Sequence, residues 1–202
     1  MLFSDIWYEY TQMIKYLTAT LAFFAFYSCS QPKIDPGPIK SDPGFSCPAS
    51  PSSIETECGF GNICRSNNDV EIRLDAEGAP IPYSALYVLM YNGKTWSAAK
   101  YEKPGKSLKT DSLKKDMFVE NLFDTLKQNN VFTLPDQDSI NTSSKFWVDD
   151  GVQYSLTFKV GKEYRKYTFN NPDIYQEKFK DIKEYANYSG IAAAFDSAFE
   201  RQ

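Results

Sequence analysis

The chain has 202 residues, of which 42% are hydrophobic and 16% aromatic, enough for one domain with a hydrophobic core and too few for two. The formal net charge of −4 argues against nucleic-acid binding, which depends on clustered Lys and Arg that meet phosphates. No histidine occurs, which excludes Ser-His-Asp catalysis, Cys-His catalysis and two-histidine zinc sites. Catalysis by carboxylates, Lys or Tyr stays open, but we expect a protein without enzymatic activity, cofactor or metal.

An apolar segment near the start of the sequence has the order of a secretory signal. From Met13 the sequence reads M-I-K-Y-L-T-A-T-L-A-F-F-A-F-Y-S-C, with one Lys, an apolar run from Tyr16 to Tyr27, then Ser28 and Cys29. The run is shorter than the roughly 18 apolar residues of a bilayer-spanning helix, which favours a cleaved signal over a permanent membrane span. Residues 1–12 contain no basic residue, so Met13 is the predicted start and residues 1–28 the predicted signal peptide.

The Ser28-Cys29 junction resembles the lipobox of bacterial lipoproteins, in which a small residue precedes a cysteine that is acylated. Phe26 and Tyr27 depart from the usual residues, in the looser form tolerated in Bacteroidetes lipoproteins. The resemblance implies that Cys29 carries acyl chains such as palmitate, which anchor the mature protein in a membrane. The expected location is therefore the cell envelope, in the outer membrane, with the domain in the periplasm or at the cell surface.

Residues 29–66 are predicted to form a tether between the lipidated cysteine and the domain, because Pro, Ser, Gly and Asp dominate residues 30–53. Beyond Cys29 the chain has three cysteines, Cys47, Cys58 and Cys64, so an oxidising compartment leaves one pair and one unpaired thiol. The short glycine-containing loop between Cys58 and Cys64 favours that pairing, but Cys47 can pair with either.

The first elements of the domain follow from hydrophobic periodicity. Residues 69–74 alternate apolar and charged side chains, as a half-buried strand does. Two apolar segments that flank Asn92-Gly93 predict a β-hairpin, because this dipeptide suits a tight turn. Residues 112–129 carry an apolar stripe at helical spacing and predict an amphipathic helix.

A second hairpin is predicted from the alternation around Gly161-Lys162, in a register that pairs Tyr154 with Phe169 and Leu156 with Tyr167. A helix over residues 173–188 and a last short helix after Gly190 complete the domain, with Gly190 as the stop between them. Residues 67–202 are thus expected to form a single α+β domain. It combines an antiparallel sheet, built from two β-hairpins plus a strand, with two or three helices packed on one face.

Both sides of the first hairpin are apolar, which suggests a ligand surface. Tyr87, Tyr91 and Trp96 share one side, while Leu86, Val88 and Met90 point to the other. If helices cover only one side, the aromatic side chains can form a platform for a sugar or a peptide. The alternative is a central hairpin that the protein's own segments cover on both sides.

Two further groups of residues bear on function. The triplet Asp138-Ser139-Ile140 resembles the O-glycosylation sequon of secreted Bacteroidetes proteins, and its place in a predicted loop makes Ser139 the candidate acceptor. The run D-Q-D-S-I-N that contains Asp136 and Asp138 lacks the third acidic ligand and the glycine of a calcium loop, while Asp150-Gly151 predicts a turn before a strand. We therefore interpret Asp136, Asp138, Asp149 and Asp150 as structural surface residues without a metal.

The sequence W-V-D-D-G-V-Q-Y-S-L-T-F-K-V-G-K-E-Y-R-K-Y-T-F-N-N-P resembles small Bacteroidetes lipoproteins that carry a domain of unknown function. The resemblance implies no activity and no functional residue. We therefore expect a membrane-anchored binding or accessory module whose partner is an envelope protein or a glycan. An inhibitor or immunity-type protein is the alternative, and a hydrolase that uses carboxylates comes third.

Overall fold

The computed structural model describes residues 34–40, 47, 50–79, 83–103, 107–113, 116–142 and 146–200. Residues Asp35–Gln202 form one compact unit. Cys29, the predicted signal peptide and the predicted start at Met13 lie outside the described residues. Among the described residues, no helix has the length and apolar character needed to cross a membrane.

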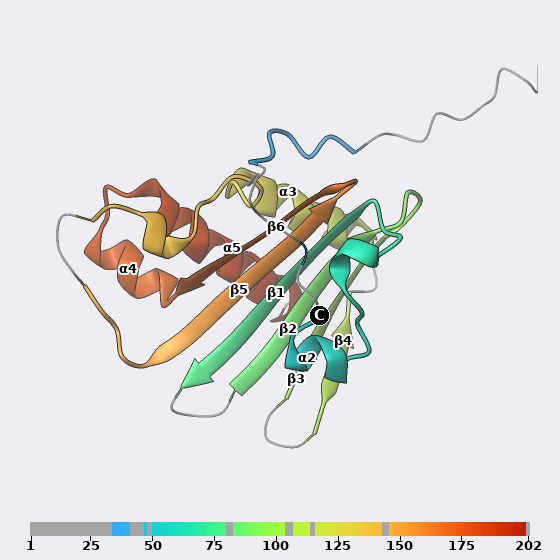
Figure 1. Ribbon diagram of the computed structural model, residues 1–202, viewed down its shortest axis with the longest axis horizontal. Helices are drawn as coiled ribbons and strands as arrows, with labels where there is room; N and C mark the ends of the chain where they lie inside the picture. The colour runs from blue at the N-terminus through green and yellow to red at the C-terminus, as the bar shows by residue number, and fades with distance from the viewer. Residues whose placement is uncertain are drawn as a thin grey trace, which may run out of the picture. The chain divides into compact units, whose positions relative to one another are not determined.

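Twelve elements follow one another along the described chain (Figure 1). They are α2 (Ser53–Glu57), η1 (Ile63–Arg65), β1 (Val70–Ala79), β2 (Tyr83–Tyr91), β3 (Trp96–Glu102), β4 (Lys109–Ser112), α3 (Asp116–Gln128), η2 (Gln137–Ser139), β5 (Gly151–Val160), β6 (Glu163–Asn170), α4 (Pro172–Lys178) and α5 (Lys183–Glu200). The six strands form one antiparallel sheet in the order β4-β3-β2-β1-β5-β6. The predicted α+β class with helices on an antiparallel sheet is confirmed.

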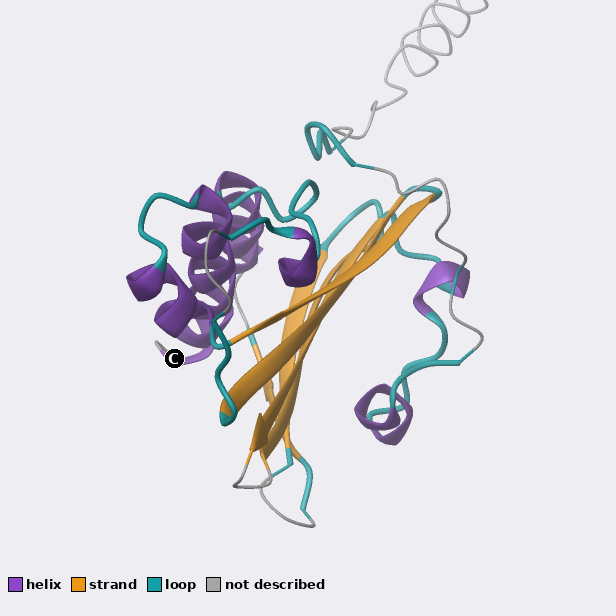
Figure 2. Ribbon diagram, turned by 60° about the vertical axis from the view of Figure 1, so that its left-hand side comes forward, coloured by secondary structure: helices purple, strands orange, loops and turns teal. Residues whose placement is uncertain are grey.

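Helices α3, α4 and α5 cover one face of the sheet (Figure 2). The side chains that point toward them from the three central strands are almost completely buried: Ile72, Leu74, Tyr87, Leu89, Leu156 and Phe158. Alternate residues of a strand point to opposite faces, so this apolar set identifies the helix-covered face as the main core. Burial of apolar surface on this face is the main source of the fold's stability.

Both predicted hairpins are confirmed, and the second has the predicted register, whereas the first has a four-residue turn in place of the two-residue turn predicted at Asn92-Gly93. Tyr91 pairs with Trp96 across the turn that contains Asn92-Gly93. In the second hairpin Tyr154 pairs with Phe169 and Leu156 with Tyr167. Tyr154 and Phe169 stack with ring centroids 5.0 Å apart, and Phe169 stacks on Tyr188 of α5 at 4.8 Å, so the aromatic face meets the helices as expected.

Residues 50–69 cover the opposite face of the sheet, where Figure 2 shows α2 and η1 on the side away from the longer helices. Ile54 of α2 is buried against Leu86 and Val88 of β2, and Phe60 packs beside them. These residues belong to the folded unit, although the sequence assigns residues 29–66 to the tether. The high Pro and Ser content of this region indicated a tether, so the short helix α2 was not predicted. Its N-terminus is stabilised by a capping box between Ser52 and Glu55.

The boundary between the last two helices differs from the predicted boundary. The break falls between Lys178 and Lys183, and Gly190 lies inside the continuous helix α5. A Cβ on Gly190 would lie 2.0 Å from Asn129 Oδ1, at the end of α3. The glycine therefore permits close approach of this segment to α5 and does not stop the helix.

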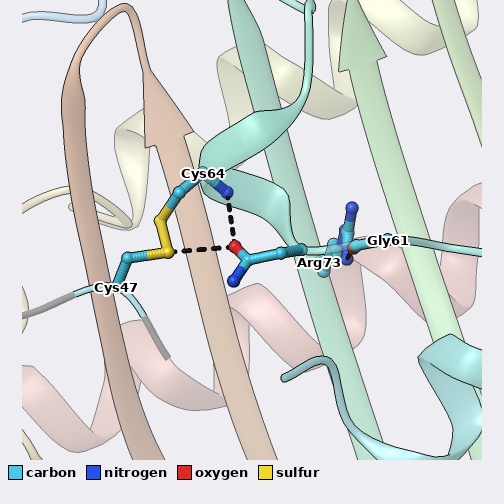
Figure 3. Close-up of a disulfide and its surroundings, with 5 residues drawn as sticks. Cys47, Gly61, Cys64 and Arg73 are labelled. Carbon is cyan, nitrogen blue, oxygen red and sulfur yellow. Dashed lines mark hydrogen bonds between the residues drawn. A yellow bond between two sulfur atoms is a disulfide. The ribbon is translucent and has the colours of Figure 1, made fainter. Parts of the chain in front are cut away.

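The structure pairs Cys47 with Cys64, so the predicted Cys58–Cys64 disulfide is wrong (Figure 3). The two Cα atoms are 6.3 Å apart, which suits a disulfide. Asn62 Oδ1 accepts a hydrogen bond from the backbone N–H of Cys64 at 3.0 Å and lies 2.9 Å from Cys47 Sγ. Cys58 keeps a free thiol because α2 directs it toward the sheet, where burial raises the pKa of the thiol.

Candidate functional site

The predicted ligand surface on the first hairpin is corrected by the burial of its aromatic side chains. Tyr87 is 2% exposed and Tyr91 is 7% exposed, while Trp96 is partly buried between Tyr91 and Phe123. The hydroxyl of Tyr87 donates a hydrogen bond to Asp196 of α5. The aromatic side faces the helices, and Ile54 and Phe60 pack on the other side, so neither side is an open platform.

Ser139, the candidate O-glycosylation acceptor, is exposed at the last residue of η2, and its neighbour Asp138 is exposed too. The hydroxyl is thus accessible to a modifying enzyme. Glycosylation itself remains a prediction.

A hollow of about 410 Å³ lies at the end of the sheet where β1 ends and β5 begins. Residues from four segments line it: the end of β1, residues 147–153, the end of β6 and the short helix η2. We call it the Trp147 hollow, because Trp147 lines it and is 76% exposed, the highest value among the described large hydrophobic side chains.

Packing beneath Trp147 fixes the loop that carries it. The Phe146 ring packs against Tyr175 and Phe179 of the α4 region, with ring centroids 5.2 Å and 5.9 Å apart. The Tyr175 hydroxyl donates a hydrogen bond to the Phe146 carbonyl at 3.2 Å. Phe146 is thus packed into the domain, while the indole of the next residue, Trp147, faces solvent.

The floor of the hollow is held by Asn171, which has the left-handed φ of 40°. Its Oδ1 accepts a hydrogen bond from the Val152 N–H at 3.1 Å, and its Nδ2 donates to the Asp150 carbonyl at 3.0 Å. Both bonds tie the start of β5 to the end of β6. The predicted turn at Asp150-Gly151 is therefore the point where the loop enters the sheet.

Helix η2 forms another wall and covers the outer edge of β6. Gln137 is 8% exposed, accepts a hydrogen bond from the Asn170 N–H at 2.7 Å and donates to Asn170 Oδ1 at 2.9 Å. Asp136 Oδ1 accepts from the Thr168 N–H at 2.9 Å. These side chains satisfy the N–H groups of Thr168 and Asn170, so the last residues of β6 do not offer these groups for pairing with another chain.

The hollow is acidic. Glu77, Asp138, Asp149 and Asp150 line it and are all exposed, and no Lys or Arg belongs to its described lining. Three of these four are the carboxylates that the sequence assigns to the surface. Among the described residues, no group of three or more His, Cys, Asp or Glu side chains is arranged to hold a metal ion.

A second polar cluster lies on the face covered by residues 50–69. Arg73 is 4% exposed and donates to Glu71 Oε1, to Glu55 Oε1 and to the Gly61 carbonyl. Glu71 also accepts hydrogen bonds from Ser66 and Asn68. The cluster is closed to solvent and joins two segments, so its role is structural.

Sequence reasoning did not single out Trp147. The sequence did contain a signal. Trp147 lies close to Asp149-Asp150-Gly151 and outside any periodic segment, so no predicted helix or strand face accounts for this aromatic residue. Comparison with protein-family models, curated proteins and solved structures finds no match to this chain.

Proposed function

We propose that the protein is a lipid-anchored binding module of the bacterial cell envelope, held by an acylated Cys29, with the Trp147 hollow as its ligand site. The signal order of residues 13–29 and the small residue before Cys29 support the anchor. The observation that carries the binding role is the 76% exposure of Trp147 beside a hollow. A large exposed aromatic side chain in a fixed position is a typical anchor of a binding interface.

The charge of the hollow selects the class of ligand. Four exposed carboxylates repel anionic glycans and phosphates, and the lining offers no described Lys or Arg to offset them. An indole face attracts a guanidinium or ammonium group. The ligand is therefore a peptide segment of an envelope protein that presents an Arg or Lys side chain to the hollow.

Calorimetry of the purified protein tests the ligand site, with a short arginine-rich peptide as the probe and a glutamate-rich peptide of equal length as the negative probe. The arginine-rich peptide binds, and its affinity falls with rising salt. Trp147→Ala reduces the affinity roughly tenfold or more, as expected for an interface anchor. Met117→Ala is the matched control, because Met117 is 62% exposed on α3 and does not line the hollow. Unchanged affinity in Trp147→Ala, or no binding by the wild type, overturns the ligand site.

Metabolic labelling with an alkyne analogue of palmitate tests the anchor separately. The wild type and Cys58→Ala incorporate the label and fractionate with membranes, whereas Cys29→Ala does neither. Cys58 is the matched control because it has a free thiol in the folded domain. Label that persists in Cys29→Ala refutes the anchor.

A further inference from the structure

The segment Asp35–Lys40, predicted to be part of a free tether, is held against the domain. The Lys40 backbone N–H donates a hydrogen bond to the Phe132 carbonyl at 3.1 Å. Lys127 Nζ, at the end of α3, donates to the Asp35 carbonyl at 2.7 Å. Figure 1 shows the segment in blue above the sheet, close to the end of α3. The Asp35–Lys40 segment therefore belongs to the folded domain.

The contact point and the Trp147 hollow lie at opposite ends of the sheet. Phe132 packs edge-to-face on Phe158 near the end of β5, with ring centroids 5.0 Å apart. The hollow surrounds Gly151 at the start of the same strand. At about 3.3 Å of rise per residue, the intervening part of the strand separates the two regions by about 20 Å.

The chain between the proposed anchor and the contact point is short. Six residues, Ser30 to Asp35, follow Cys29. Even fully extended, they reach about 20 Å. A domain anchored through Cys29 must therefore keep the Asp35–Lys40 end close to the lipid headgroups.

The same end of the sheet has an excess of positive charge. Val70 pairs with both Tyr91 and Val160, which brings the β2–β3 turn and the β5–β6 turn together at this end. The lysines there are Lys40, Lys94, Lys127, Lys159 and Lys162, and the carboxylates are Asp35, Asp69, Glu163 and Glu71, which is buried and paired with Arg73. We call the three exposed lysines, Lys40, Lys94 and Lys162, the basic end.

We infer that the basic end rests on an anionic lipid surface and that the Trp147 hollow points away from the membrane. This inference rests on the proposed acylation of Cys29. Lysines near an anionic bilayer gain favourable electrostatic energy, while the acidic hollow at the other end is repelled. Chain length and charge distribution thus select the same orientation, which leaves the ligand site open to a partner outside the membrane.

Amine-reactive footprinting of the full lipidated protein tests the orientation. The protein is inserted into vesicles of equal parts phosphatidylglycerol and phosphatidylcholine, labelled briefly with an acetylating reagent and analysed by mass spectrometry. Lys94 and Lys162 are labelled severalfold more slowly in these vesicles than in detergent, and high salt removes the protection. Lys180 and Lys183 are matched controls, because both are exposed in the α4–α5 region and are labelled equally in both conditions.

The outcomes separate the orientation from the anchor. Lipidated protein that floats with the vesicles but has equally labelled lysines overturns the orientation and leaves the anchor intact. Protein whose intact mass lacks acyl chains overturns the anchor and, with it, the orientation. In a Lys94→Glu, Lys162→Glu double variant that still floats, faster labelling of Lys40 than in the wild type supports the basic end as the contact, because Lys40 is its one remaining exposed lysine.

Discussion

The side chain of Asn171 occupies the space in front of Gly151, so closely that a Cβ on Gly151 would lie 1.7 Å from Asn171 Oδ1. Gly151 also has a φ of 127°, a backbone conformation that other L-residues rarely adopt. This pair joins the start of β5 to the end of β6 and shapes the floor of the Trp147 hollow.

Gly151→Ala is expected to destabilise the domain by more than about 1 kcal/mol, because it combines backbone strain with a clash. Thermal unfolding measures the effect. Gly61→Ala is the matched control, since a Cβ there has no atom within 4 Å and the backbone is not left-handed. Equal midpoints for the two variants would contradict the role assigned to Gly151.

Arg73→Met is expected to destabilise the domain by about 3 to 5 kcal/mol, because it leaves the buried Glu71 carboxylate without its cation. Residues 50–69 should then become sensitive to protease, since Arg73 joins them to β1 through Glu55 and Gly61. Denaturant unfolding and limited proteolysis provide the readouts.

The control for this change is Lys103→Met, which removes a more exposed ion pair with Glu57. It should change stability by no more than about 1 kcal/mol. A similar loss in both variants would show that the Arg73 cluster does not hold residues 50–69.

Cys47→Ser is expected to lower stability by about 3 kcal/mol, because the Cys47–Cys64 disulfide closes a loop with a sequence separation of 17. Peptide mapping of the oxidised protein checks the pairing directly, with alkylation at Cys58 alone in the folded domain. A disulfide-linked peptide that contains Cys58 and Cys64 would contradict the structure.

Asp75 gives the domain a specific pH dependence. Burial raises the pKa of Asp75 to about 6, and its buried Oδ1 has no hydrogen-bond partner among the described residues. Because the folded-state pKa lies above the unfolded value, this group stabilises the fold fully below about pH 4. The contribution is lost as the pH rises through about 6.

We therefore expect Asp75→Asn to raise the melting temperature at pH 7 and to have little effect at pH 4, measured by calorimetric scans across this range. Glu120→Gln, at an exposed position on α3 and absent from the charges that raise the pKa of Asp75, is the control and should keep the wild-type pH profile. A profile in Asp75→Asn that parallels the wild type would refute the assignment.

Local patterns predicted much of the fold. The turn at Asn92-Gly93 and the alternation around Gly161 predict both hairpins, and period-2 alternation places the aromatic residues on one face. A shift of two residues keeps every side chain on its face, so alternation did not predict the wider turn of the first hairpin. The position of β1 between β2 and β5 was not predictable in this way, because strand order depends on contacts between segments far apart in sequence.

The candidate site was harder to predict, because it depends on what covers each surface. Tyr87 and Trp147 are both large aromatic residues, but α5 covers Tyr87 and leaves Trp147 exposed. Burial by a distant helix has no local sequence signal. The function of Gly190 was misread for the same reason, since only the neighbouring Asn129 side chain explains the glycine.

The most direct test of the binding role is photo-crosslinking in the native envelope, with a photoreactive phenylalanine analogue in place of Gln153, an exposed residue that lines the Trp147 hollow. The same analogue in place of Met117 on α3 is the control. A discrete protein adduct from position 153, absent from position 117 and lost on adding Trp147→Ala, is the predicted result. Adducts that are equal at both positions, or that persist without Trp147, would contradict the assignment of the hollow as the ligand site.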